Sequence, residues 1–141
     1  MEVDINMWGV FWAAVSSMVI GSIWYAKGVF GAAWMKLAGV DEKKMREDMD
    51  WTPMAAMFVL ALVMAYVLAH VTYLSAEFFT DKSFHYAAVS SGFWMWLGFV
   101  VTTTLGTGLF SGTRKKLMAI NLGNWLVTLV VMGWVIGFVG L

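Results

Sequence analysis

A stripe of polar side chains in the middle of the chain has the residue types that bind metals or move protons. The stripe consists of Tyr66, His70, Tyr73 and Glu77. This spacing places all of them on one helix face, and His85 follows closely enough to approach them. Imidazole and carboxylate groups are metal ligands, and imidazole also titrates near neutral pH. The stripe predicts a metal site or a proton relay, and the alternative is a group of interfacial side chains that hydrogen-bond one another and water.

A second polar group lies near the C-terminal end of the sequence, within an apolar stretch. Asn121 and Asn124 are followed by Thr128, and Thr102 lies in the preceding apolar stretch. An amide group in lipid requires a hydrogen-bond partner, and a neighbouring helix is the usual source. Two interpretations follow: these side chains hold helices together, or they line a ligand or permeation site.

The remaining residues exclude several other kinds of chemistry. The chain has no cysteine, which excludes disulfides, zinc-thiolate sites and iron–sulfur clusters. It contains no nucleophile elbow, zincin or Walker motif, so we expect no enzymatic activity and no cofactor. The net charge is zero, which offers no attraction for nucleic acid. No Asp, Glu, Lys or Arg lies well inside an apolar run, and this argues against an ion-coupled pump.

Four long apolar runs position these side chains. The chain of 141 residues is 61% hydrophobic and 13% charged, whereas soluble domains are about 25% charged. The runs cover residues 5–26, 53–74, 84–109 and 117–140. A helix needs about 20 residues to cross a bilayer core of about 30 Å, and each run is long enough. The sequence therefore predicts an all-α fold: an integral membrane four-helix bundle, surrounded by the lipid bilayer, that forms a single transmembrane domain over residues 1–141.

Basic residues are distributed unevenly over the connections between the runs. The first and third connections carry eight of the nine Lys and Arg residues, and Lys82 in the second connection is the ninth. Positively charged connections stay in the cytoplasm. We therefore expect a multi-pass protein of the cell inner membrane with both termini on the outer, periplasmic side.

The first connection, residues 27–52, has a helical pattern of its own. Apolar residues recur at helical spacing around Trp34, which predicts a short interfacial helix on the cytoplasmic surface. Gly39 is expected to end this helix. Asp41 is then placed to cap a second short helix over residues 42–48.

Three aromatic residues flank the start of this connection. Trp24 and Tyr25 end the first apolar run, and Trp34 lies in the connection itself. Amphipathic aromatic rings favour the boundary between membrane and water. We expect all three to anchor the protein at the inner interface.

Rows of small residues mark helix faces that can pack closely. The fourth run carries Gly133 and Gly137, a GxxxG pair, and the third carries Gly98, Thr102 and Gly106. Small residues let membrane helices approach one another. Such rows serve either packing within one chain or association between chains. We expect a homo-oligomer with the fourth run as its subunit interface, and these faces are also compatible with a larger membrane complex.

Two groups of residues resemble the signature of a known family. The first is Asn6, Gly21-Ser-Ile-Trp24-Tyr25, Val29-Phe30-Gly31 and Trp34, and the second is Ala119-Ile-Asn121-Leu-Gly123. In these residues the chain resembles the domain of unknown function 1761 family of small bacterial four-helix membrane proteins, over nearly its whole length. The resemblance implies a four-helix inner-membrane protein, and it implies no activity. Asn124 departs from the aromatic residue expected in that family.

Three functions are compatible with these patterns. The first is a non-enzymatic, homo-oligomeric structural or binding module of the membrane. The second is a small pore or carrier for a neutral or weakly polar solute, formed around Asn124. The third is an outer-face metal or proton site at His70, Glu77 and His85.

Overall fold

The computed structural model describes residues 3–47 and 50–140, and helices account for most of them. The elements in chain order are α1 (Met7–Trp24), the π-helical turn η1 (Lys27–Gly31), α2 (Ala32–Ala38), α3 (Glu42–Glu47), α4 (Thr52–Phe78), α5 (Phe84–Met95), the π-helical turn η2 (Trp96–Val101), α6 (Thr102–Ser111) and α7 (Lys115–Val139). Four helices are long and apolar enough to cross a membrane: α1, α4, the continuous helix α5–η2–α6, and α7. The predicted all-α membrane bundle, with a helical segment between its first two spanning helices, is confirmed.

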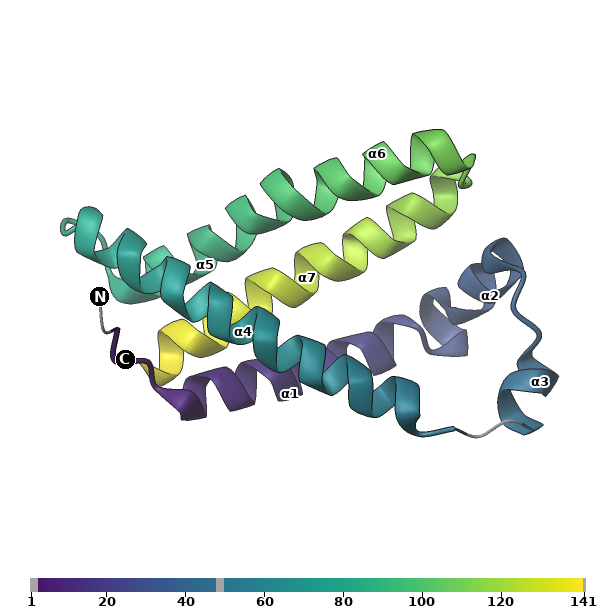
Figure 1. The fold of residues 1–141 in the computed structure, drawn as a ribbon, viewed down its shortest axis with the longest axis horizontal. Coiled ribbons are helices and arrows are strands. Elements are labelled where there is room, and N and C mark those ends of the chain that lie inside the picture. The colour runs from purple at the N-terminus through teal and green to yellow at the C-terminus, as the bar shows by residue number, and fades with distance from the viewer. Residues whose placement is uncertain (1–2, 48–49, 141) are drawn as a thin grey trace.

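The spanning helices run up and down between two ends of the bundle (Figure 1). The terminal end carries the start of α1, the end of α7 and the connection at residues 79–83. The basic end carries residues 25–47, residues 50–51 and the connection at residues 112–114. The helices lie close together at the terminal end, whereas α6 and the first half of α7 diverge from α4 towards the basic end (Figure 1). As a result, α6 packs mainly on α7.

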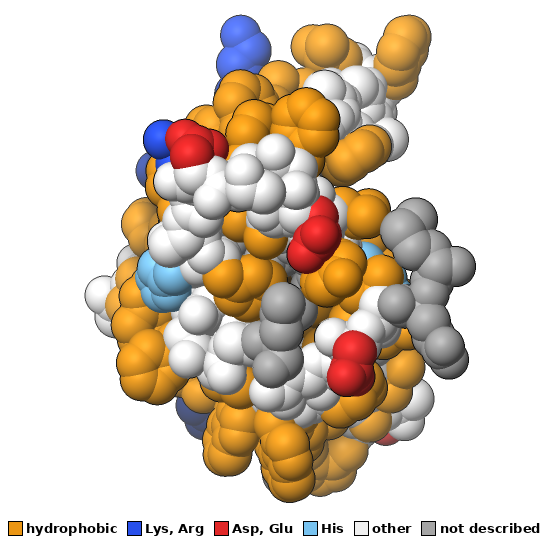
Figure 2. All heavy atoms as spheres, turned by 90° about the vertical axis from the view of Figure 1, so that its left-hand side faces the viewer, with side chains coloured by type: hydrophobic (Ala, Val, Ile, Leu, Met, Phe, Trp, Pro, Cys, Tyr) orange, Lys and Arg blue, Asp and Glu red, His pale blue; other side chains and the backbone are white. Residues whose placement is uncertain are grey.

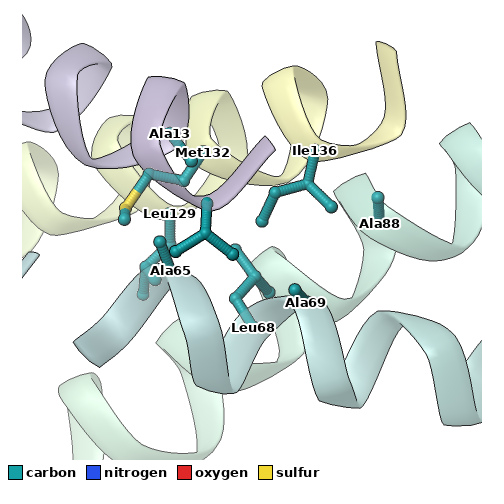
Figure 3. Close-up of a cluster of buried hydrophobic side chains, with 9 residues drawn as sticks. Ala13, Ala65, Leu68, Ala69, Ala88, Leu129, Met132 and Ile136 are labelled. Carbon is teal, nitrogen blue, oxygen red and sulfur yellow. The ribbon is translucent and has the colours of Figure 1, made fainter. Parts of the chain in front are cut away.

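The core lies in the terminal half, where α1, α4, α5 and α7 meet (Figure 3). Alanines allow the helices to approach: Ala13 on α1, Ala65 on α4 and Ala88 on α5 are all fully buried. Leu68 and Met132 fill the space between them and are also fully buried. Because lipid is as apolar as such a core, close packing provides most of the stabilisation.

The glycines of α7 are used for packing inside the chain. A Cβ at Gly133 would overlap the carbonyl oxygen of Ala88, and a Cβ at Gly137 would lie 2.8 Å from the Cα of His85. Only glycine permits backbones to come this close. The prediction that the GxxxG face forms a subunit interface is therefore wrong, because α5 of the same chain already occupies it.

The third spanning helix contains a π-helical turn, η2, that the sequence pattern does not predict. On both sides of η2 the helix faces α7 with small residues, namely Ala88, Gly92 and Gly108. A row of residues spaced by four drifts about 40° per step around an α-helix of 3.6 residues per turn. The extra residue of a π turn takes up part of this drift. The turn therefore keeps Gly108 on α7, while Gly98 and Gly106 face away from the protein.

The spanning helices differ in length from the predicted runs. α1 begins at Met7, two residues later than expected, because the side chain of Asn6 caps it by accepting the N–H of Trp8 over 3.0 Å. α4 continues to Phe78, four residues beyond the predicted end, so Glu77 lies within the helix. Hydropathy marks only the membrane-buried part of a helix, and polar residues continue it into the aqueous boundary.

The connection between α1 and α4 has the two short helices that its pattern predicts. Gly39 follows α2 in the left-handed conformation, with φ of 70°. The carboxylate of Asp41 accepts the N–H of Lys43 over 2.9 Å and thereby caps α3. The predicted last residue of this helix, at position 48, lies outside the described residues.

Candidate functional site at the basic end

The end of α1 is joined to the start of α7 by two side-chain hydrogen bonds. The indole Nε1–H of Trp24 donates to the carbonyl oxygen of Ile120 over 3.1 Å, and the hydroxyl of Tyr25 donates to Oδ1 of Asn121 over 2.9 Å. Each bond joins residues that are 96 positions apart in the chain. Both bonds are partly shielded from solvent, so they fix how far α1 and α7 slide along each other.

A third donor, Trp96 of η2, approaches α7 from another helix. Its Nε1–H donates to the carbonyl oxygen of Leu122 over 2.9 Å. A carbonyl oxygen has two lone pairs, so a helical carbonyl can accept an indole N–H in addition to its backbone bond. Trp24 and Trp96 thus hold the same turn of α7 from two helices. Trp96 was not among the predicted site residues, although an indole well inside an apolar run is a signal because its N–H needs a partner.

Two glycines make this arrangement possible. Gly123 of α7 faces the indole of Trp24, and a Cβ there would lie 2.9 Å from the ring. Gly31 closes η1, where its N–H donates to the carbonyl oxygen of Ala26 over 2.9 Å. A Cβ at Gly31 would overlap the carbonyl oxygen of Tyr25. The chain therefore turns directly after Tyr25, so that η1 lies against the end of α1, and α2 packs on α7.

Aromatic rings pack around this turn and form what we term the aromatic cluster: Trp24, Tyr25, Phe30 and Trp34. The rings of Trp24 and Phe30 have centroids 4.6 Å apart, and those of Tyr25 and Trp34 are 5.4 Å apart in an edge-to-face arrangement. The three residues predicted as interfacial anchors therefore lie in one cluster. Trp24 and Tyr25 also have an interhelical role that the sequence did not indicate.

Deeper in the bundle, Asn124 and Thr128 have buried polar atoms without partners. The two residues are 7% and 2% exposed. Within the described residues, neither Oδ1 of Asn124 nor Oγ1 of Thr128 has a hydrogen-bond partner. Such a buried atom costs about 1–3 kcal/mol. The polar group of α7 is thus divided: Asn121 joins two helices, whereas these two atoms do not.

Thr102 does not approach Asn124. Its Oγ1 donates to the carbonyl oxygen of Gly98 over 2.6 Å, and the side chain is exposed on the lipid side of the helix. Thr103 and Thr107 likewise donate to carbonyl oxygens of their own helix. The preceding turn offers each hydroxyl an immediate acceptor. The pocket predicted between these threonines and Asn124 is therefore not formed.

The polar stripe near the terminal end is not assembled as a metal site. Nδ1 of His70 lies 3.0 Å from the carbonyl oxygen of Tyr66, and their rings have centroids 4.4 Å apart. His85 packs edge-on against Trp134, at 6.0 Å between centroids, and Glu77 is exposed. Among residues 3–47 and 50–140, no three His, Cys, Asp or Glu side chains are grouped to hold a metal ion. The metal prediction at His70, Glu77 and His85 is therefore wrong, because each imidazole packs against a different aromatic ring.

The surface of the terminal end agrees with the separation of His70, Glu77 and His85 from one another. Figure 2 shows that end as mainly hydrophobic, with histidine and acidic side chains scattered among the apolar ones. An interfacial role for these polar side chains, the alternative interpretation of the stripe, remains a prediction.

Most of the chain falls within the range of one protein family. A family model described as "Protein of unknown function (DUF1761)" matches residues 8–137. The chain belongs to this family. In this DUF1761 protein the two groups of signature-like residues meet in space, because Trp24 and Tyr25 of the first bind Ile120 and Asn121 of the second. No curated protein and no solved structure matches the chain.

The DUF1761 chain also holds α3 against the basic end through ion pairs. Lys27 pairs with Glu42, and the guanidinium of Arg46 lies 3.2 Å from the same carboxylate. The hydrogen bond from Lys27 lowers the pKa of the Glu42 carboxyl below its ordinary value. The carboxylate therefore stays ionised at neutral pH and links α3 to the residues that follow α1.

Proposed function

We propose that this multi-pass membrane protein is a non-enzymatic module that associates with copies of itself. The observation that carries the proposal is an uncovered row on the third spanning helix, Gly98, Thr102 and Gly106, which we term the small-residue face. Among the described residues, no atom outside the helix itself lies within 4 Å of a Cβ added at Gly98 or Gly106. The face thus has the composition of a helix–helix contact and no partner within the chain.

The chemistry of the small-residue face supports contact with another helix. Thr102 donates its hydroxyl proton to the carbonyl oxygen of Gly98, so the face presents no unsatisfied donor to an approaching apolar helix. Glycines four residues before and after Thr102 allow a second backbone to come close, and packing contacts then drive association in lipid. The same face on a second copy is the partner we propose, and a larger membrane complex is an extension of it.

The charge distribution supports a location and an orientation for this module. Eight of the nine Lys and Arg residues lie at or near the basic end, and Lys82 lies at the terminal end. Basic segments are retained in the cytoplasm. We therefore propose an inner-membrane protein with both termini on the periplasmic side.

Cysteine crosslinking in bilayers tests the self-association. The chain has no cysteine, so a single introduced thiol reports without background. Oxidation is expected to give a covalent dimer of the Gly106→Cys variant. The matched control is Gly21→Cys on α1, where a Cβ also has open space. If Gly106→Cys gives no covalent dimer, the proposed face is contradicted. Equal dimer yields from Gly106→Cys and Gly21→Cys, at a low ratio of protein to lipid, contradict it as well.

The partnerless atoms of Asn124 and Thr128 favour a second candidate function, binding or passage of a small neutral polar solute. Each of these buried atoms is free to accept a hydrogen bond from such a solute. Glycerol uptake by liposomes, followed by stopped-flow light scattering, is the test. A carrier should lose uptake in Asn124→Leu and keep it in Asn121→Leu if that variant still folds. Uptake no faster than in protein-free liposomes contradicts this candidate for the probe used.

A further inference from the structure

A pocket with a volume of about 460 Å³ lies between α4 and α5 near the terminal end. The aromatic cluster lies at the opposite, basic end of the bundle. The inner end of the pocket, at Phe99, adjoins the small-residue face, because the hydroxyl of Thr102 lies 3.2 Å from the carbonyl oxygen of Phe99. Ligand sites commonly have volumes of about 300–1,000 Å³. The pocket is therefore large enough to take part of a bound molecule.

The polarity of the pocket walls changes along its length. Lys82 lies at the terminal end beside Phe79 and Tyr86, and Ser75 and Ser90 follow on the two helices. Trp94 and Phe99 continue the wall towards the middle of the membrane. Phe99 lies about 20 Å along the helix axis from the start of α5, at about 1.5 Å per residue. The pocket thus matches a molecule with a polar head at the membrane boundary and an apolar chain extending inward.

Hydroxyl groups in this pocket are available to a ligand. Elsewhere in the spanning helices, Ser17 and Thr72 donate to carbonyl oxygens of their own helix, which is the usual arrangement in lipid. In the part of the chain that the structure describes, Ser75, Ser90 and Ser91 form no such bond. All three line the pocket, and Ser91 is only 5% exposed. Their hydroxyls can therefore donate to an oxygen-rich head group.

The pocket opens sideways, where lipid surrounds the protein. Three of its lining residues, Tyr86, Trp94 and Phe99, are 57%, 63% and 69% exposed. Lys82 places a cation at the polar end. Its ammonium pairs with Asp81 over 3.0 Å, but the two side chains are 49% and 70% exposed, and such surface pairs are weak. An anion entering from the membrane can therefore recruit Lys82.

We propose that this pocket binds an anionic phospholipid from the outer leaflet side of the terminal end. The phosphate would accept hydrogen bonds from Lys82 and the pocket serines. One acyl chain would lie along Trp94 and Phe99. This inference does not require self-association, although Phe99 is the chain neighbour of Gly98 on the small-residue face. It rests on the orientation proposed above for the outer leaflet.

Photolabelling of the full-length protein in nanodiscs tests the proposal. The probe is a phosphatidylglycerol with a diazirine in one acyl chain, and mass spectrometry locates the labelled residues. Labelling is expected to concentrate on Trp94, Met95 and Phe99, and to be displaced by unlabelled phosphatidylglycerol more readily than by phosphatidylcholine. Lys82→Gln should lower that preference about fivefold, while the control Lys36→Gln, at the basic end, should leave it unchanged.

A variant with a larger side chain in the pocket provides a second, independent test of lipid binding. Ser90→Leu should reduce labelling of Trp94 severalfold, whereas Ser22→Leu, on an exposed position of α1, should not. Circular dichroism melting of both variants establishes that they fold. Labelling spread evenly over the lipid-facing surfaces, equal displacement by the two lipids, or unchanged labelling in a folded Ser90→Leu variant would overturn the proposal.

Discussion

The phenol of Tyr25 and the side-chain amide of Asn121 are joined by a hydrogen bond of 2.9 Å across 96 residues of sequence. Tyr25 ends the first spanning helix, and Asn121 lies in the second turn of the last one. The bond therefore connects the first and last spanning helices at the basic end of the bundle, in addition to their contact at the terminal end, where Gly9 faces Val139. Its loss should loosen the aromatic cluster without disturbing the core around Met132.

Tyr25→Phe should destabilise the folded protein by about 0.5–1.5 kcal/mol, the net contribution of one partly buried hydrogen bond. Chemical denaturation in detergent measures the change in the free energy of unfolding. Asn121→Ala and the double variant complete a cycle, in which the two effects should be less than additive. Tyr66→Phe, at an exposed tyrosine, is the control and should be neutral. Full additivity in the cycle contradicts the direct bond.

Gly31→Ala should destabilise the protein, whereas Gly28→Ala should not. A Cβ at Gly31 overlaps the carbonyl oxygen of Tyr25, so this variant should lose about 1–3 kcal/mol. A Cβ at Gly28 meets no atom within 4 Å, so alanine there should be neutral or stabilise by up to about 1 kcal/mol. Thermal melting of both variants in the same detergent makes the comparison. Equal effects would show that the turn after Tyr25 does not depend on close backbone contact.

Asn124→Leu should leave the protein as stable as before or stabilise it by about 1–2 kcal/mol. The substitution keeps the side-chain size and removes a buried oxygen that has no partner. Asn121→Leu should have the opposite effect, because it removes the acceptor of Tyr25. The free energies of unfolding of the two variants are the measurement. A marked loss of stability in Asn124→Leu is the result that would refute this assignment, since it would mean that the amide holds helices together.

The attachment of α3 should weaken in acid. Because the folded-state pKa of Glu42 is lowered, its contribution to stability is fully present above its ordinary pKa of about 4.5 and is lost as the pH falls through the lower folded-state value. Intrinsic amide exchange slows between pH 6 and pH 3, so the measurement is the protection factor of the α3 amides, which should fall over this range (about 0.15 M salt). Glu42→Gln should show low protection factors throughout. A wild-type profile identical to that of Glu42→Gln would contradict the ion pair.

The sequence predicted the two short helices, α2 and α3, more accurately than it predicted which rows of small residues pack inside the chain. Gly39 and Asp41 act through their own backbone neighbourhood, so a left-handed glycine and a capping carboxylate could be recognised from local order alone. Gly133 and Gly98 belong to equally plausible packing rows, yet α5 covers the first and nothing in the described chain covers the second. Helical spacing is the same in both cases, so it could not distinguish them.

The candidate functional site shows the same contrast between features set by local sequence and features set by helix packing. Asn121 and Asn124 were predicted as a pair, but only Asn121 meets a side chain from another helix. The role of Trp96 and the pocket beside Ser90 were not predicted at all. Both depend on which helix lies next to which, and on the π turn that sets the rotation of the third spanning helix.

Composition and run length alone establish the membrane character, the four spanning helices and the uneven distribution of basic residues. These properties are sums over each segment, and they do not depend on how the segments pack. The tertiary structure decides which glycine row packs inside the chain, which asparagine has a hydrogen-bond partner and where a pocket opens. In a membrane, lipid-facing and protein-facing surfaces are both apolar, so hydropathy cannot tell them apart and only the packing of one helix on another decides.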